Sequence, residues 1–256
     1  MITVVGGIKG GGGKTTLATN LCVMRTQAGK RVLLVDADEQ HTASDWASQR
    51  EALGIETKWV TIKLAGKAIH SEIKKMIDHY DDVIIDVGGR DTTSQRSALA
   101  IANVCVIPFK PKSFDMWTLG AVKSLICEMT AVNHGLKAFT VINQADPRGS
   151  DNDDALEMIN EVEDLISLPV SIGYRKAFAN AAAFELGAYW FRPRGLDNRC
   201  ADALFKGVPM SKNDDGRIDF SNWGGLNDVT RYPYEFVENN APSEYTFGNL
   251  GGVVYY

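Results

Sequence analysis

Five short runs of apolar residues, rich in Val and Ile, recur along the chain before residue 145. Nearly every position in them is apolar, which is typical of parallel strands buried on both faces of a sheet. The runs are ITVV, RVLLVD, DVIIDV, NVCVIPF and KAFTVIN, at 2–5, 31–36, 82–87, 103–109 and 137–143. A sixth run, TKWVTI at 57–62, alternates more and predicts a strand nearer the edge of the sheet.

Segments with helix-like composition and spacing lie between and after these runs. They cover 15–28, 43–53, 67–80, 114–133 and 151–166. Repeated alternation of strand and helix predicts an α/β fold, with a doubly wound, mostly parallel sheet covered by helices on both faces. We expect this domain to span residues 1–206.

The composition is that of an ordinary soluble globular chain. At 256 residues it can bury a full core without metal or disulfide staples. Its net charge of −5 excludes a protein coated in basic residues, although a local basic patch is compatible with it. The four cysteines are scattered without a CxxC pair, which predicts reduced thiols. With no signal-peptide pattern and no apolar run near the ~20 residues that span a bilayer, we expect a cytoplasmic protein.

The last fifty residues, 207–256, differ from the rest. They hold three Lys or Arg against seven Asp or Glu, and 9 of the 23 aromatic residues. Disordered segments are normally poor in aromatics. We therefore expect an acidic, aromatic extension that packs on the main domain.

A glycine-rich loop, GGIKGGGGKTT at 6–16, joins the first predicted strand to a helix that begins near Lys14. Glycines let backbone N–H groups curl around an anion, and the helix N-terminus adds positive potential. Lys14 can reach the β- and γ-phosphates of a nucleotide, and the Thr15 hydroxyl can bind Mg²⁺. The strict phosphate-loop pattern is incomplete, because Ile8 occupies its first glycine position. The predicted nucleotide-binding residues of this loop are Gly10, Gly11, Gly12, Gly13, Lys14, Thr15 and Thr16.

Three aspartates follow or end predicted strands. Asp36 and Asp38 lie two residues apart at the end of one, and Asp86 ends another, just before Gly88 and Gly89. The carboxyl ends of strands are where open α/β sheets bind their ligands. The alternative for each single aspartate is a turn or helix-capping role.

KGGGGKTT, VDADEQ and VIIDVGG together resemble the deviant Walker A, A′ and Walker B motifs of the ParA/MinD family of P-loop ATPases. The similarity covers about residues 1–190 and is closest to the short plasmid-partition ParA type, which lacks an N-terminal helix-turn-helix domain. Glu39 stands where the A′ motif commonly has proline, and Val87-Gly88-Gly89 replaces a proline-containing turn, so the hydrolysis rate stays open.

The resemblance implies a role for each motif residue. Lys9 would contact the nucleotide of the partner subunit in an ATP-bound homodimer, and Asp38 would orient the attacking water. Asp36 and Asp86, with Thr15, would hold Mg²⁺ and its waters. Asn143, which ends the strand 137–143, matches the position at which the family reads adenine, although a strand-ending turn asparagine is the alternative. Lys9, Lys14 and Asp38 are the implied catalytic residues.

The resemblance also implies a Mg²⁺-dependent ATPase with slow hydrolysis, stimulated by a ParB-like or adaptor protein. Its ATP dimer would bind DNA non-specifically, associate with the nucleoid and segregate DNA or another large cargo. The candidate DNA surface lies in 173–206, which contains six Lys or Arg and three Asp or Glu. The alternative for this stretch is a solvated helical face. The residues chosen as DNA contacts are Arg175, Lys176, Arg192, Arg194 and Arg199.

Three other functions fit the sequence less well. A MinD-like membrane-cycling regulator needs a basic amphipathic C-terminal helix, whereas this chain ends EYTFGNLGGVVYY, so we expect no stable membrane anchor. An iron–sulfur or metabolic relative needs paired cysteines or a substrate pocket, and Cys105 has no cysteine near it in sequence. A bacterial tyrosine kinase is disfavoured because those kinases are not marked by the lysine at Lys9.

Overall fold

The computed structural model describes residues 1–55, 57–111, 117–146, 148, 150–174 and 178. The helices and strands, in chain order, are β1 (Ile2–Val5), α1 (Lys14–Gln27), β2 (Val32–Ala37), α2 (Thr42–Ala52), β3 (Val60–Lys63), α3 (Ala68–Met76), the 3-10 turn η1 (Ile77–His79), β4 (Asp82–Val87), α4 (Thr93–Leu99), β5 (Val104–Phe109), α6 (Leu119–Val132), β6 (Lys137–Ala145), α7 (Asp151–Asn160) and β7 (Ile166–Gly173).

The strands form one seven-stranded sheet in the order β3-β2-β4-β1-β5-β6-β7, and every pair is parallel. This confirms the predicted α/β fold, including the edge position of the strand in 57–62. β1 lies between β4 and β5, so the chain winds outward in opposite directions on either side of it. The carboxyl end of β1 is therefore at the switch point of the sheet, where folds of this type bind ligands.

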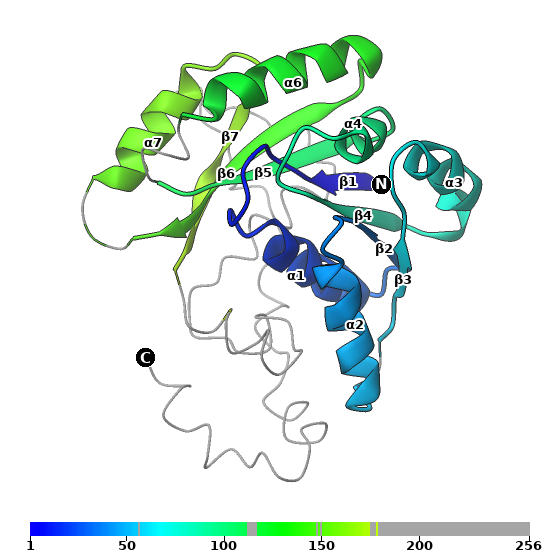
Figure 1. Ribbon diagram of the computed structural model, residues 1–256. Helices are drawn as coiled ribbons and strands as arrows, with labels where there is room; N and C mark the ends of the chain where they lie inside the picture. The colour runs from blue at the N-terminus through cyan, green and yellow to red at the C-terminus, as the bar shows by residue number, and fades with distance from the viewer. Residues whose placement is uncertain (56, 112–116, 147, 149, 175–177, 179–256) are drawn as a thin grey trace, which may run out of the picture.

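Helices cover both faces of the sheet (Figure 1). On one face, α1 and α2 pack through residues such as Leu17, Leu21 and Ala43. On the other, α3, α4, α6 and α7 pack through residues such as Ile73 and Leu99. The two apolar cores explain why the central strands are apolar at nearly every position: alternate side chains serve opposite faces.

The predicted helix at 151–166 is wrong at its C-terminal end. α7 ends at Asn160, and Ile166–Gly173 forms the edge strand β7. β7 contains Pro169, and its pairing with β6 shifts register between Ser167 and Ser171, on either side of that proline. Proline has no N–H for the ladder, which suits the edge position and the register shift of β7. An edge strand that is only partly buried and interrupted by proline lacks the uniform apolar pattern of the inner strands.

A second element, α4, was not predicted. It has seven residues, too few to show a helical period. Its sequence signal is local: the Thr92 side chain accepts a hydrogen bond from the backbone N–H of Gln95, at 3.1 Å. Thr92-x-x-Gln95 is the pattern of a capping box.

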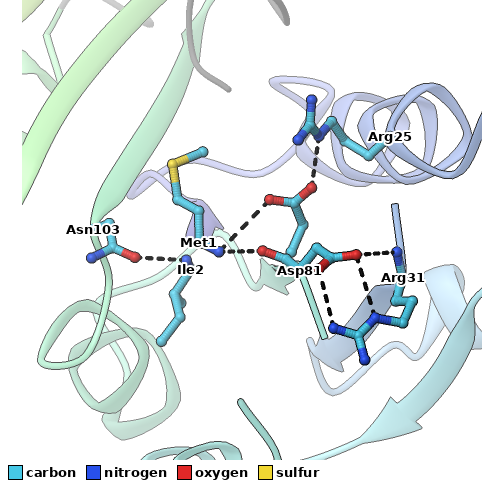
Figure 2. Close-up of polar contacts among 7 residues, drawn as sticks. Met1, Ile2, Arg25, Arg31, Asp81 and Asn103 are labelled. Atoms are coloured by element: carbon cyan, nitrogen blue, oxygen red, sulfur yellow. Dashed lines mark hydrogen bonds and ion pairs between the residues drawn. The ribbon is translucent and has the colours of Figure 1, made fainter. Parts of the chain in front are cut away.

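At the amino edge of the sheet, charged groups form ion pairs (Figure 2). The Arg25 guanidinium, in the last turn of α1, donates to the Asp82 carboxylate at the start of β4, at 2.7 Å. The Met1 ammonium lies 3.7 Å from the same carboxylate. Arg31 and Asp81 form an exposed pair at 3.2 Å beside it. These pairs join the end of α1 and the starts of β1 and β2 to β4.

The described residues bear on the cysteine and membrane predictions, whereas two other sequence predictions lie outside them. Cys22, Cys105 and Cys127 are free thiols, as predicted, and the first two are buried. None of the described helices is both long and apolar enough to cross a membrane. The predicted DNA contacts Arg175, Lys176, Arg192, Arg194 and Arg199, and the extension 207–256, lie outside the described residues.

Candidate nucleotide-binding site

The glycine-rich loop joins β1 to α1 at the carboxyl edge of the sheet, and its conformation requires glycine. Gly11 and Gly13 have φ values of +75° and +88°, in the region that favours glycine. A Cβ atom on Gly13 would lie 2.3 Å from the Asn143 side-chain amide, and one on Gly12 would lie 3.2 Å from the Pro108 carbonyl oxygen. The run of glycines therefore lets the loop pack against the ends of β5 and β6.

The other flank of the loop packs against the turn after β4. A Cβ atom on Gly89 would lie 2.6 Å from the backbone nitrogen of Gly10 and 2.8 Å from the carbonyl carbon of Lys9. Contact this close is possible only for glycine at position 89. The Val87-Gly88-Gly89 departure from the family pattern thus has a physical reason: this turn supports the segment that carries Lys9.

Lys14 lies inside the loop, where its side chain is 7% exposed. Its Nζ donates a hydrogen bond to the Lys9 carbonyl oxygen at 2.8 Å. Burial lowers the pKa of Lys14, and the nearby carboxylates of Asp86 and Asp38 partly oppose that change. The Lys9 side chain, by contrast, is exposed. The two lysines of the motif therefore occupy different environments, one within the loop and one on its surface.

Asp86 is buried, and neither of its carboxylate oxygens accepts a hydrogen bond from the described residues. Burial raises its pKa to about 7, and the neighbouring Asp36 and Asp38 act in the same direction. The Thr15 hydroxyl and the Lys14 ammonium lie close enough to oppose this rise in part. A buried carboxylate without a partner, beside a hydroxyl and a second carboxylate, fits a Mg²⁺ ion with oxygen ligands.

Asp36 is the register partner of Asp86 on the adjacent strand β2, which places the two carboxylates side by side. It also has a structural role, because it accepts a hydrogen bond from the backbone N–H of Ser44, in the first turn of α2, at 2.7 Å. The capping alternative is thus seen for Asp36, together with a position suited to a metal ligand. No group of three His, Cys, Asp or Glu converges on a point among the residues that the structure describes. Mg²⁺ bound through one or two carboxylates, phosphates and waters does not need one.

Asp38 lies just beyond β2 and is half-buried. One of its carboxylate oxygens accepts a hydrogen bond from the Gln40 N–H at 3.1 Å, and it lies 3.5 Å from where a Cβ of Gly88 would be. The carboxylate is therefore held over the turn that follows Asp86. This position suits a group that orients water, and that role remains a prediction.

Asn143, at 8% exposed, connects the loop to β6. Its side-chain amide donates to the Gly12 carbonyl oxygen at 2.7 Å, and its side-chain oxygen accepts from the Gln144 N–H. This explains why a polar side chain is buried at that strand end. Contact with adenine stays a prediction, as do the contacts of Thr15 and Thr16 with a nucleotide.

Two residues at this edge were missed from the sequence. Gln95, 1% exposed in α4, accepts a hydrogen bond from the Gly7 N–H at 3.3 Å and so supports the start of the loop. Lys110, the first residue after β5, places its Nζ 3.7 Å from the Cβ position of Gly11. The contact of Gln95 with the loop gave no sequence signal, because its partner Gly7 is 88 residues away. Lys110 had the signal that identified Asp86, a polar residue at the carboxyl end of an apolar run.

Comparison with known proteins identifies relatives of this site. The CobQ/CobB/MinD/ParA nucleotide-binding domain matches residues 2–188. The maintenance of carboxysome distribution protein A of Halothiobacillus neapolitanus is 29% identical over 72% of this chain and 87% of its own length. Protein ParA of Rhizobium radiobacter is 30% identical over 47% of this chain and 53% of its own.

Among solved structures, the fold resembles a putative plasmid partition protein of Borrelia burgdorferi bound to AMPPNP. The TM-score is 0.61 at 16% identity, with 80% of this chain and 96% of that chain covered. The family match spans most of the chain, and it includes the glycine-rich loop and the three aspartates. The chain thus belongs to the CobQ/CobB/MinD/ParA family of nucleotide-binding domains.

Proposed function

We propose that the protein is a Mg²⁺-dependent ATPase of the ParA type, which dimerises when it binds ATP and positions DNA or another large cargo. The observation that carries this proposal is that the two lysines of the loop differ in burial. Lys14 is buried, with its ammonium bonded inside the loop, whereas the Lys9 side chain is exposed. A second cation on the surface of a phosphate loop suits contact with a nucleotide on a facing subunit.

Different residues of the site would bind the phosphates, the Mg²⁺ ion and the adenine. Backbone N–H groups of Gly10–Gly13 and the Lys14 ammonium would bind the phosphates, with Thr16 at the start of α1 beside them. Thr15, Asp86 and Asp36 would hold Mg²⁺, which supplies charge neutralisation to phosphoryl transfer. Asn143, already bonded to the loop, would lie near the adenine.

Asp38 and Lys9 would act on the hydrolytic step. Asp38, half-buried over the turn after β4, accepts a hydrogen bond from backbone and has oxygen lone pairs left to orient a water. Lys9 of the facing subunit would stabilise the negative charge that spreads over the transferring phosphoryl group. Because hydrolysis then needs two subunits and an oriented water, slow turnover that an adaptor protein accelerates is the expected behaviour.

The cargo class rests on similarity. One relative is named for carboxysome distribution and another is named ParA. We propose that the ATP dimer binds DNA non-specifically through the basic stretch 173–206, including Arg175, Lys176, Arg192, Arg194 and Arg199, and associates with the nucleoid in the cytoplasm. A ParB-like or adaptor protein would link it to the cargo.

Dimerisation is the step that distinguishes this function from that of a monomeric nucleotide-binding protein. Light scattering should show a dimer for the wild type with Mg-ATP and a monomer with Mg-ADP. Lys9→Ala should stay monomeric with Mg-ATP while its ATP affinity, measured by calorimetry, changes by no more than about threefold. A Lys9→Ala protein that dimerises as the wild type does would refute the cross-subunit role.

A further inference from the structure

Lys110 brings a third lysine to the phosphate loop, from a part of the chain that the loop motif does not include. It follows β5 directly, and β5 pairs with β1, the strand that leads into the loop. Both strands end at the same edge of the sheet, which places Lys110 beside the loop. Its Nζ lies 3.7 Å from the Cβ position of Gly11.

The surroundings of Lys110 are suited to the binding of an anion by its ammonium group. The side chain is half-buried, and among the described residues it has neither a hydrogen bond nor an ion pair. Gly11 has a left-handed φ of +75°, within a run of backbone whose N–H groups are suited to anion binding. A partly desolvated ammonium gains more from a phosphate oxygen than a fully hydrated one, because the interaction is charge-assisted and less screened by water.

The three lysines are arranged differently around the loop. Lys14 is within it, Lys9 belongs to the flank that packs on Gly89, and Lys110 lies by Gly11, on the flank that faces the end of β5. We propose that Lys110 is a phosphate-binding residue, which contacts the polyphosphate held by the loop of its own subunit. This rests on the proposed ATP site, but on neither dimerisation nor DNA binding.

Nucleotide affinity, measured by calorimetry, tests the proposal without reference to hydrolysis. Mg-ATP is titrated into wild type, Lys110→Ala, Lys110→Gln and Lys110→Arg. The same variants are then made in a Lys9→Ala background, whose oligomeric state is measured by light scattering and is expected to be monomeric. Lys137→Ala is the matched control, since Lys137 is an exposed lysine at the opposite end of the adjacent strand β6.

Removal of the charge by Ala or Gln should weaken ATP binding about tenfold in both backgrounds, whereas Lys110→Arg and Lys137→Ala should stay within about threefold of their parent. Gln preserves most of the side chain's bulk, so equal losses with Ala and Gln identify the charge as the cause. Circular dichroism confirms that each variant is folded.

Three results would overturn the proposal. ATP affinity within about twofold of the parent for both Lys110→Ala and Lys110→Gln would exclude a phosphate contact. An equal loss in Lys137→Ala would show a general charge effect, and a loss confined to the dimeric background would place the contact across the interface. A wild type that binds no ATP would instead refute the nucleotide site itself, which keeps the two failures distinguishable.

Discussion

The two ends of β4 carry buried aspartates in opposite situations. Asp82, 2% exposed, has the Arg25 guanidinium at 2.7 Å and the Met1 ammonium at 3.7 Å (Figure 2). Asp86, four residues later and 1% exposed, has neither a hydrogen-bond partner nor an ion pair among the described residues. Burial of a carboxylate is costly unless a cation or hydrogen-bond donors compensate for it. The amino edge of the sheet therefore contributes to stability, while the carboxyl edge holds a buried carboxyl group whose ionised form is not compensated by the described residues.

The same contrast holds for the lysines and arginines. Arg25 and Arg31 at the amino edge are paired with aspartates of the same chain. At the carboxyl edge, Lys14 bonds a carbonyl oxygen of the loop, and its nearest carboxylates influence its pKa without forming an ion pair within the described residues. An anionic ligand with a bound cation would satisfy both signs of charge there at once.

The substitution with the strongest consequence should be one that impairs ligand binding at the carboxyl edge. Lys14→Ala should weaken Mg-ATP binding at least about a hundredfold, because it removes the buried ammonium proposed to bind the phosphates. Calorimetry measures this, with Lys137→Ala as the control for loss of a lysine at the opposite edge. Unchanged affinity in Lys14→Ala would contradict the assignment of the loop.

The second prediction concerns the pH dependence of stability in the ligand-free protein. The folded-state pKa of Asp86, about 7, is raised above its ordinary value of 3.8. Burial of Asp86 therefore does not destabilise the folded protein below pH ~4. The destabilisation grows as pH rises from ~4 to about 7 and is constant above that, because over this range the group is ionised in the unfolded chain but protonated in the folded one. Asp86→Asn, which stays neutral, should gain about 2–4 kcal/mol relative to wild type between pH ~4 and ~8.

Urea unfolding at both ends of that pH range measures the difference. Asp82→Asn is the matched control, since it alters a buried aspartate at the other end of the same strand and should not show this gain. A stability difference between Asp86→Asn and wild type that is flat with pH would show that the carboxylate is compensated in the folded protein.

Third, Arg25→Met breaks the paired edge. It removes the guanidinium but keeps much of the apolar stem, so the buried Asp82 loses its main partner, at a cost of about 2–3 kcal/mol in the free energy of unfolding. Urea unfolding measures this loss, and ATP affinity should remain within about twofold of wild type. Wild-type stability in Arg25→Met would mean that the pair adds nothing to the fold.

The smallest effect is expected for Arg31→Ala, which removes the exposed partner of Asp81. The Arg31 side chain holds the pKa of Asp81 at about 2 in the folded protein, yet both groups are open to water, and such pairs add little to stability. Thermal unfolding should show a Tm close to that of wild type. A drop in Tm as large as that of Arg25→Met would show that exposure does not separate the two pairs.

What the sequence predicted, and what it did not, follows from how local each signal is. The inner strands are buried on both faces, so their uniform apolar runs identified them, and glycines and aspartates at their ends predicted the candidate site. β7, at an edge and with Pro169 in it, had no such pattern, and α4 was too short for one. Gln95 depends on a contact with Gly7 across 88 residues, which one-dimensional spacing does not encode.

The proposed function requires ATP to convert this protein into a form that binds DNA. Binding of a labelled, random-sequence DNA duplex should be measured with Mg-ATP, with Mg-ADP and without nucleotide, over a range of salt concentrations. Binding should require ATP, be lost in Lys9→Ala and weaken steeply with salt. Equal DNA binding without nucleotide would contradict the proposed function. So would the absence of DNA binding in every nucleotide state together with ATP-dependent binding to anionic lipid vesicles.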